Sequence, residues 1–218
     1  IGRISYNYAE KYLLTTNFRT DLSTLFGPEY RAGYFPSVST GWVISREDFF
    51  NVAPVSFLKL RASWGQNGST SNLGSFGYLS LITSVYRYAN AAEQLERASE
   101  PRAISNPALR WEVSEQTDIG LDLGLLNNKL FFTADYYYKL TKDLITQSTF
   151  ATLYGNYNSS INAGNILNQG VELELSWKDN FGRLNYNISV NAAYNYNEVT
   201  NTGAQEKLFG TTIFTDDD

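Results

Sequence analysis

The 218-residue chain has neither cysteine nor histidine, and both absences restrict its chemistry. Without cysteine it can hold no disulfide framework and no thiolate metal site. Without histidine it lacks the commonest catalytic base and the commonest metal ligand. Serine-histidine-aspartate, cysteine-histidine and histidine-metal centres are therefore impossible within this sequence. It predicts no enzyme, no catalytic or metal-binding residue and no cofactor.

Charge and long apolar runs are also scarce. Charged residues make up 18% of the chain, whereas a soluble domain usually has about 25%. The net charge of −5 and the scattered basic residues indicate no nucleic-acid surface. A transmembrane helix needs a run of about 18 apolar residues, and the sequence contains none. A membrane-spanning β-barrel is not excluded, because its strands are only about 10 residues long and are marked by alternating apolar and polar residues.

Alternation of apolar and polar residues is what the chain has in abundance. Apolar positions are filled by Leu, Val, Ile and Tyr, and the positions between them by Asn, Ser, Thr, Gly and Asp with few Lys. Period-2 alternation predicts β-strands with one apolar and one polar face. The predicted strands, about eight in number, cover residues 4–8, 12–19, 37–42, 58–64, 118–125, 130–139, 171–177 and 184–197. The fold class is therefore all-β and antiparallel.

The connections between these strands are of two lengths. Short ones cover residues 9–11, 127–129 and 178–182, and long ones cover 22–34, 66–109 and 141–168. Short turns on one side and long loops on the other are typical of antiparallel barrels in a bilayer. Asn127, Asn128 and Gly182 can supply the positive φ angles of tight hairpins. The medium link from Ser45 to Ser56 is expected to hold a helical turn with Ser45 as N-cap.

Residues 31–65 (RAGYFPSVSTGWVISREDFFNVAPVSFLKLRASWG) carry the most specific motif. This stretch resembles the barrel of SusC/RagA-type TonB-dependent outer-membrane receptors. The matching residues are Phe35-Pro36-Ser37-Val38-Ser39, Gly41-Trp42, Ile44-Ser45, Glu47, Phe49-Phe50 and the run 57–65. A second stretch from Asn106 to Leu144, with the motif NPALRWE, and a third around Asn168, Gly170 and Glu172 resemble later hairpins of the same family.

The resemblance implies a transmembrane β-barrel segment, about eight strands of a barrel of about 22. It further implies the outer membrane of a Gram-negative bacterium, contact with outer-membrane lipid, and uptake of glycans or peptides. Family members are commonly covered by a SusD-like surface lipoprotein and take energy from TonB–ExbB–ExbD through an N-terminal part. No plug domain, signal peptide or TonB box is recognisable, so residues 1–218 are expected to be part of a longer barrel chain.

Several polar and aromatic residues are candidates for binding or chemistry. Glu172 and Glu174 lie two residues apart on one strand face, and glycosidases use two carboxyls about 5–10 Å apart. With Asp118, Asp122 and Asp135, however, they are better interpreted as a hydrated face. The acidic run 216–218 would offer oxygen ligands to Ca²⁺, but a loop end is the favoured interpretation. The candidate substrate-binding residues are the loop tyrosines Tyr86, Tyr88, Tyr154 and Tyr157, which would stack on sugar rings or hold a peptide.

Two other proteins fit the same alternation. A small, complete eight-stranded outer-membrane barrel would serve as an anchor or adhesin. A secreted carbohydrate-binding β-sandwich would use the polar face in bulk water, although such a face usually carries more Lys and Glu than this chain has.

Overall fold

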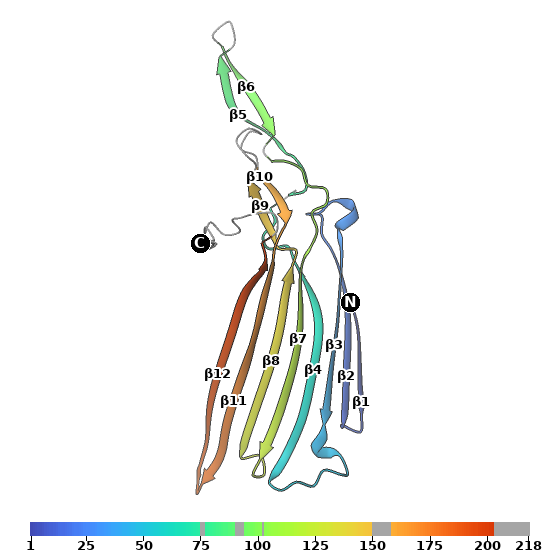
Figure 1. The fold of residues 1–218 in the computed structure, drawn as a ribbon, viewed down its shortest axis with the longest axis vertical. Helices are drawn as coiled ribbons and strands as arrows, with labels where there is room; N and C mark the ends of the chain where they lie inside the picture. Colours follow the sequence, from blue (N-terminus) through green and yellow to red (C-terminus); the bar gives the residue numbers. More distant parts are fainter. Residues whose placement is uncertain (75–76, 90–93, 102, 150–157, 203–218) are drawn as a thin grey trace, which may run out of the picture.

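The computed structural model describes residues 1–74, 77–89, 94–101, 103–149 and 158–202, which form mainly one antiparallel sheet of eight strands. All eight predicted strands are confirmed. Strands of this sheet that follow one another in the sequence are also neighbours in space (Figure 1). In spatial order they are β1 (Gly2–Tyr8), β2 (Tyr12–Leu22), β3 (Ala32–Val43), β4 (Val55–Ser69), β7 (Glu112–Leu125), β8 (Leu130–Lys142), β11 (Asn165–Phe181) and β12 (Leu184–Asn201).

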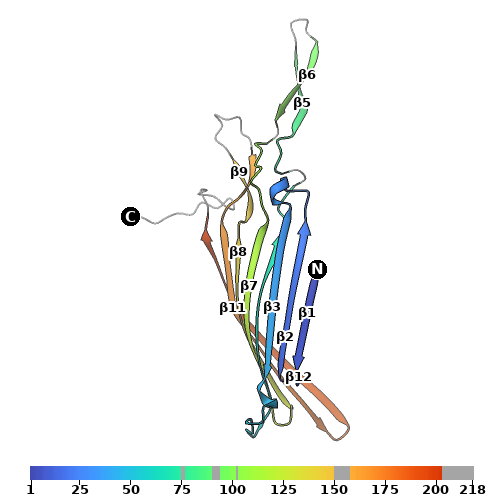
Figure 2. The same ribbon diagram turned by 90° about the vertical axis from the view of Figure 1, so that its right-hand side faces the viewer.

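Two long connections contain hairpins that the alternation did not predict. The first is β5 (Ile82–Ala89) with β6 (Leu95–Pro101), and the second is β9 (Ile145–Thr149) with β10 (Asn158–Asn162). Treating residues 66–109 and 141–168 wholly as loops was therefore wrong. Both hairpins stand beyond the end of the main sheet (Figure 2). Apart from Ile145 and Ser159, the described residues of these strands are not buried, so little imposes the alternation that marks the other strands.

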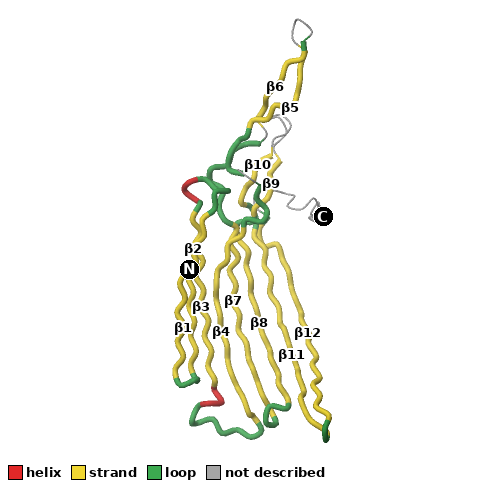
Figure 3. Tube along the Cα trace, turned by 180° about the vertical axis from the view of Figure 1, so that it is seen from behind, coloured by secondary structure: helices red, strands yellow, loops and turns green. Residues whose placement is uncertain are grey.

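The opposite end of the sheet carries three short turns and the longer β3–β4 link (Figure 3). Asn127 and Asn128 have φ angles of 58° and 62°, and Gly182 has 61°, which confirms their predicted turn roles. The β3–β4 link opens with a 3-10 helix, η2 (Ile44–Arg46), so a helical turn is present. The N-cap prediction was wrong, because β3 runs on through Val43 and leaves Ser45 inside the turn, with no side-chain cap.

The main sheet is a single layer with two free edges. β1 and β12 occupy the ends of the strand order and do not pair with each other, and the described residues form no second sheet packed against it. A small closed barrel requires pairing of the first and last strands, and a sandwich requires two packed sheets. The arrangement therefore favours neither alternative. None of the helices in the described part is long and apolar enough to cross a membrane.

Candidate functional site

The strand register sorts the side chains into two faces that run unbroken across the sheet. One row of directly paired residues is apolar. It consists of Trp42, Leu60, Leu121, Ala134, Leu173 and Ala192. The next row, one residue along each strand, points to the other face. It consists of Gly41, Arg61, Gly120, Asp135, Glu172 and Ala193. Because side chains alternate along a strand, the eight strands share one apolar and one polar surface.

Many large apolar side chains on the apolar face are exposed, which is energetically unfavourable in water. Ile119 is 57% exposed, Leu173 41% and Val190 63%. Monomeric soluble proteins rarely expose contiguous apolar patches above a few hundred Å². Aromatic side chains lie toward both ends of this face, with Tyr12 and Trp42 near the short turns and Tyr136 and Tyr138 nearer the long connections. Such an apolar band with aromatic ends is what a lipid-facing barrel wall requires.

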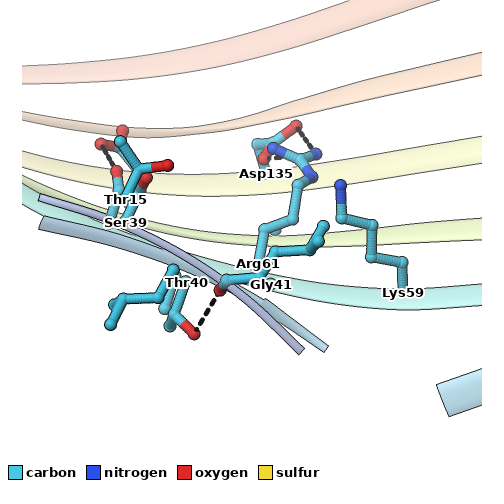
Figure 4. A pocket seen from close by; sticks show the side chains of 13 residues that line it. Thr15, Ser39, Thr40, Gly41, Lys59, Arg61 and Asp135 are labelled. Carbon is cyan, nitrogen blue, oxygen red and sulfur yellow. Dashed lines mark hydrogen bonds and ion pairs between the residues drawn. The ribbon is translucent and has the colours of Figure 1, made fainter. Parts of the chain in front are cut away.

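The polar face is organised around the Arg61 guanidinium. Its Nε and Nη2 atoms donate to the Asp122 carboxylate, each at 3.0 Å, and Nη2 also lies 3.0 Å from Asp135 Oδ1. Figure 4 shows Arg61 reaching toward Asp135 with Lys59 beside it, while Thr40 points to the opposite side of the sheet. One cation thus bridges two carboxylates from neighbouring strands.

The remaining carboxylates do not form a catalytic centre with this network. Asp118 accepts hydrogen bonds from Ser63 Oγ at 3.0 Å and Gln116 Nε2 at 2.7 Å. Glu172 and Glu174 share one face of β11, opposite Asp135 and Thr133 respectively. The described residues contain no group of three or more acidic side chains placed to hold a metal, and residues 216–218 lie outside them. Hydrogen-bonded, solvent-accessible carboxylates fit a hydrated wall better than an acid–base pair.

At the short-turn end, Glu47 gathers the residues of the specific sequence motif. Its carboxylate accepts a hydrogen bond from Trp42 Nε1 at 3.0 Å and lies 3.1 Å from the Lys11 ammonium. The rings of Tyr8, Tyr12 and Trp42 stack in succession beside it, with centroids 6.4 Å apart. Hydrogen bonds from Tyr12 and Trp42 hold the pKa of the Glu47 carboxyl below its usual value, and Lys11 adds to the effect.

At the opposite end, the motif NPALRWE anchors the long connections to one another. Leu109 and Phe26 are fully buried and pack with Ile145, and Trp111 lies against Phe26 with ring centroids 5.1 Å apart. Tyr30, Leu73 and Tyr78 complete this cluster. We call Phe26, Leu109 and Ile145 with these four aromatic and aliphatic neighbours the loop core.

Hydrogen bonds extend the loop core to the β9–β10 hairpin. Asn106 Nδ2 donates to the Ser160 carbonyl at 2.9 Å, and the Arg110 backbone N–H donates to Asn162 Oδ1 at 2.9 Å. The Arg110 side chain pairs with Asp143 at 2.7 Å. The sequence motif marked this segment as specific but assigned it no role. The missed signal was the pair of large apolar residues Leu109 and Trp111 just before β7.

The predicted substrate-binding tyrosines remain untested. Tyr86 and Tyr88 lie on β5 of the outer hairpin, and Tyr88 is 55% exposed. The side chain of Tyr86 and the whole of Tyr154 and Tyr157 lie outside the described part of the structure. The geometry therefore places only the Tyr88 side chain, on the projecting hairpin well away from Arg61.

Comparison with known proteins agrees with this geometry along nearly the whole chain. The family model "TonB dependent receptor-like, beta-barrel" matches residues 2–217. The TonB-dependent receptor SusC of Bacteroides thetaiotaomicron is 33% identical over 205 residues, which cover 91% of this chain and 20% of the relative. The TonB-dependent receptor P26 of Formosa agariphila is 33% identical over 209 residues, covering 93% and 20% respectively.

Solved structures show the same arrangement. The RagAB peptide importer in its closed-closed state superposes with a TM-score of 0.79 and 26% identity, over 96% of this chain and 22% of that one. The siderophore receptor PirA of Pseudomonas aeruginosa shares the fold with a TM-score of 0.56 at 15% identity, over 91% of this chain and 34% of that one. This chain spans about a fifth of the length of the curated relatives. These relatives are receptors, not enzymes, and the chain belongs to the TonB-dependent receptor-like β-barrel family.

Proposed function

We propose that this chain is part of the wall of an outer-membrane importer that takes up glycans or peptides in a Gram-negative bacterium, driven by TonB–ExbB–ExbD. One observation carries the proposal. The sheet has an apolar face and a polar face across all eight strands, with short turns at one end and long connections at the other. This is the arrangement of a barrel wall between lipid and a polar lumen. Similarity to the RagAB peptide importer supports peptides as cargo, and similarity to the TonB-dependent receptor SusC supports the TonB-dependent class.

A SusD-like surface lipoprotein is the partner we propose for the long-connection end. The loop core supports this, because a partner needs an ordered surface and the core packs three separate connections together. In the same proposal, Tyr86, Tyr88, Tyr154 and Tyr157 contact the cargo from the outer loops. Aromatic rings offer flat apolar surfaces to sugars and peptides. No chemistry on the cargo is proposed, because the wall supplies only surface.

The decisive experiment isolates the native protein from outer membranes and identifies what is bound to it. We expect a species about five times the mass of this 24.6 kDa chain, together with a lipoprotein. Deleting the gene should abolish growth on one class of glycan or peptide, and Tyr88→Ala should weaken uptake more than Tyr88→Phe. A lone 24.6 kDa species without a partner would contradict the proposal.

A further inference from the structure

Several glycines lie on the polar face inside strands, among them Gly41 on β3, Gly120 and Gly124 on β7 and Gly170 on β11. None has a left-handed backbone conformation, so conformational freedom does not explain them. Glycine in a strand weakens it unless the missing side chain makes room for something else. At Gly120 and Gly170 a side chain from a neighbouring strand fills the space.

Over Gly120 the filling group is Arg61. Gly120 pairs with Arg61 of β4 on one side and with Asp135 of β8 on the other. A Cβ atom at Gly120 would lie 2.8 Å from the Arg61 Cζ and would overlap the Asp135 carboxylate. The guanidinium therefore crosses β7 over a residue without a side chain, and forms its ion pair with Asp135 two strands away.

Gly124 differs from Gly120. It pairs with Phe57 of β4 and with Phe131 of β8, whose rings stack with centroids 6.1 Å apart and planes at 25°. A Cβ at Gly124 would lie 2.5 Å from Asn128 Oδ1 of the following turn and 3.0 Å from the Phe57 Cβ. The space over Gly124 is therefore taken by the turn residue Asn128 and the stem of Phe57, and no ring crosses it.

Over Gly170 the crossing side chain is Tyr137. Gly170 pairs with Tyr137 of β8 and with Asn195 of β12. The Tyr137 hydroxyl donates to Asn195 Oδ1 at 2.9 Å. A Cβ at Gly170 would lie 2.8 Å from the Tyr137 hydroxyl oxygen and 2.9 Å from its Cζ, and it would also overlap the backbone carbonyl oxygen of Tyr194 on β12. An aromatic ring covering a strand glycine is a known stabilising device in sheets.

Both crossings involve β8, at Asp135 and Tyr137. We infer that Gly120 and Gly170 are positioning residues, whose missing side chains let braces cross one strand to reach the next. The braces join β4, β7, β8, β11 and β12 through side chains as well as backbone hydrogen bonds. This part of the wall is therefore a rigid panel with β8 as its central strand.

A double-mutant cycle in the full-length receptor tests the inference, with the thermal midpoint of the folded barrel as readout. The four proteins are wild type, Gly120→Ala, Arg61→Ala and the double variant. We expect Gly120→Ala to lower the midpoint by several degrees in wild type and to have almost no effect once Arg61 is removed. Coupling of this kind is expected only where the two residues share one space. In a second cycle with Gly170→Ala and Tyr137→Ala, the loss caused by Gly170→Ala should shrink but persist, because the added Cβ would also overlap the Tyr194 carbonyl oxygen.

Gly41→Ala is the matched control, since Gly41 also lies in a strand on the polar face. A Cβ there would meet only the flexible end of Lys59, at 3.1 Å, and Leu13. Its effect should be small and independent of Arg61. If Gly120→Ala alone fails to fold, rescue of folding by Arg61→Ala supports the brace. Equal midpoint losses in both backgrounds, or no rescue, would overturn it.

Discussion

Glu47 shows how one residue explains a sequence motif. It lies in the β3–β4 link but binds Trp42 of β3 and Lys11 of the β1–β2 turn. Three strands are thereby tied together at the end of the sheet through one carboxylate. The tryptophan and the acidic residue of the motif are five positions apart, and the turn η2 brings them into contact.

Replacing Glu47 with glutamine should lower the thermal midpoint of the receptor in a pH-dependent way. The pKa of Glu47 is lowered in the folded protein by hydrogen bonds from Tyr12 and Trp42. The carboxylate therefore contributes stability that is fully present above its ordinary pKa of 4.5 and is lost as the pH falls through the lowered value. We expect Glu47→Gln to be less stable at neutral pH and equal to wild type in strong acid.

Asp48→Asn is the control for Glu47, because the Asp48 side chain is fully exposed and reaches Lys11 only at 3.5 Å. It should change the midpoint little at any pH. A Glu47→Gln deficit that persists unchanged in acid would show that the carboxylate charge is not responsible.

At the scale of elements, the apolar side of the strands, which we propose faces lipid, should not accept charge. Lysine at Leu121 or Leu173 should destabilise the folded receptor by about 2–4 kcal/mol if these residues lie near the bilayer midplane. Thr133→Lys on the polar face of β8, which pairs with Asp122, should cost far less. Unfolding titrations in lipid vesicles measure the difference. A neutral Leu121→Lys would contradict the assignment of faces.

The loop core packs apart from the strands of the wall and should therefore unfold independently of them. Leu109 is fully buried, so Leu109→Ala should cost about 2–5 kcal/mol within this cluster. We expect faster protease cleavage in the two outer hairpins, while the heat resistance of the barrel is retained. Leu22→Ala, at an 80% exposed position near the same end, should leave cleavage unchanged. Loss of barrel heat resistance in Leu109→Ala would show that the loop core and the wall are one cooperative unit.

At the scale of the whole molecule, the free edges of β1 and β12 are the decisive feature. In lipid every backbone donor and acceptor must be paired, so a sheet with open edges is not stable there. Residues 1–218 expressed alone and refolded in detergent should therefore not give a heat-modifiable monomer, whereas the full-length receptor should. A heat-modifiable 24.6 kDa monomer would instead support a small complete barrel.

The two outer hairpins are the elements that the sequence did not predict. The segment β6 reads LERASEP, with little strand preference and no alternation. Its pairing with β5 depends on a contact between segments, not on a local pattern. The same applies to β9 and β10, which pair across residues 150–157.

The sequence by itself determined the all-β class, the eight strands of the wall, their two faces and their tight turns. It could do so because a wall with one apolar and one polar face imposes a period of two on every strand. Only the tertiary structure decided which side chains meet across strands, such as Arg61 with Asp135 over Gly120. Strand register and loop packing set those contacts between residues distant in sequence, and no local pattern encodes them.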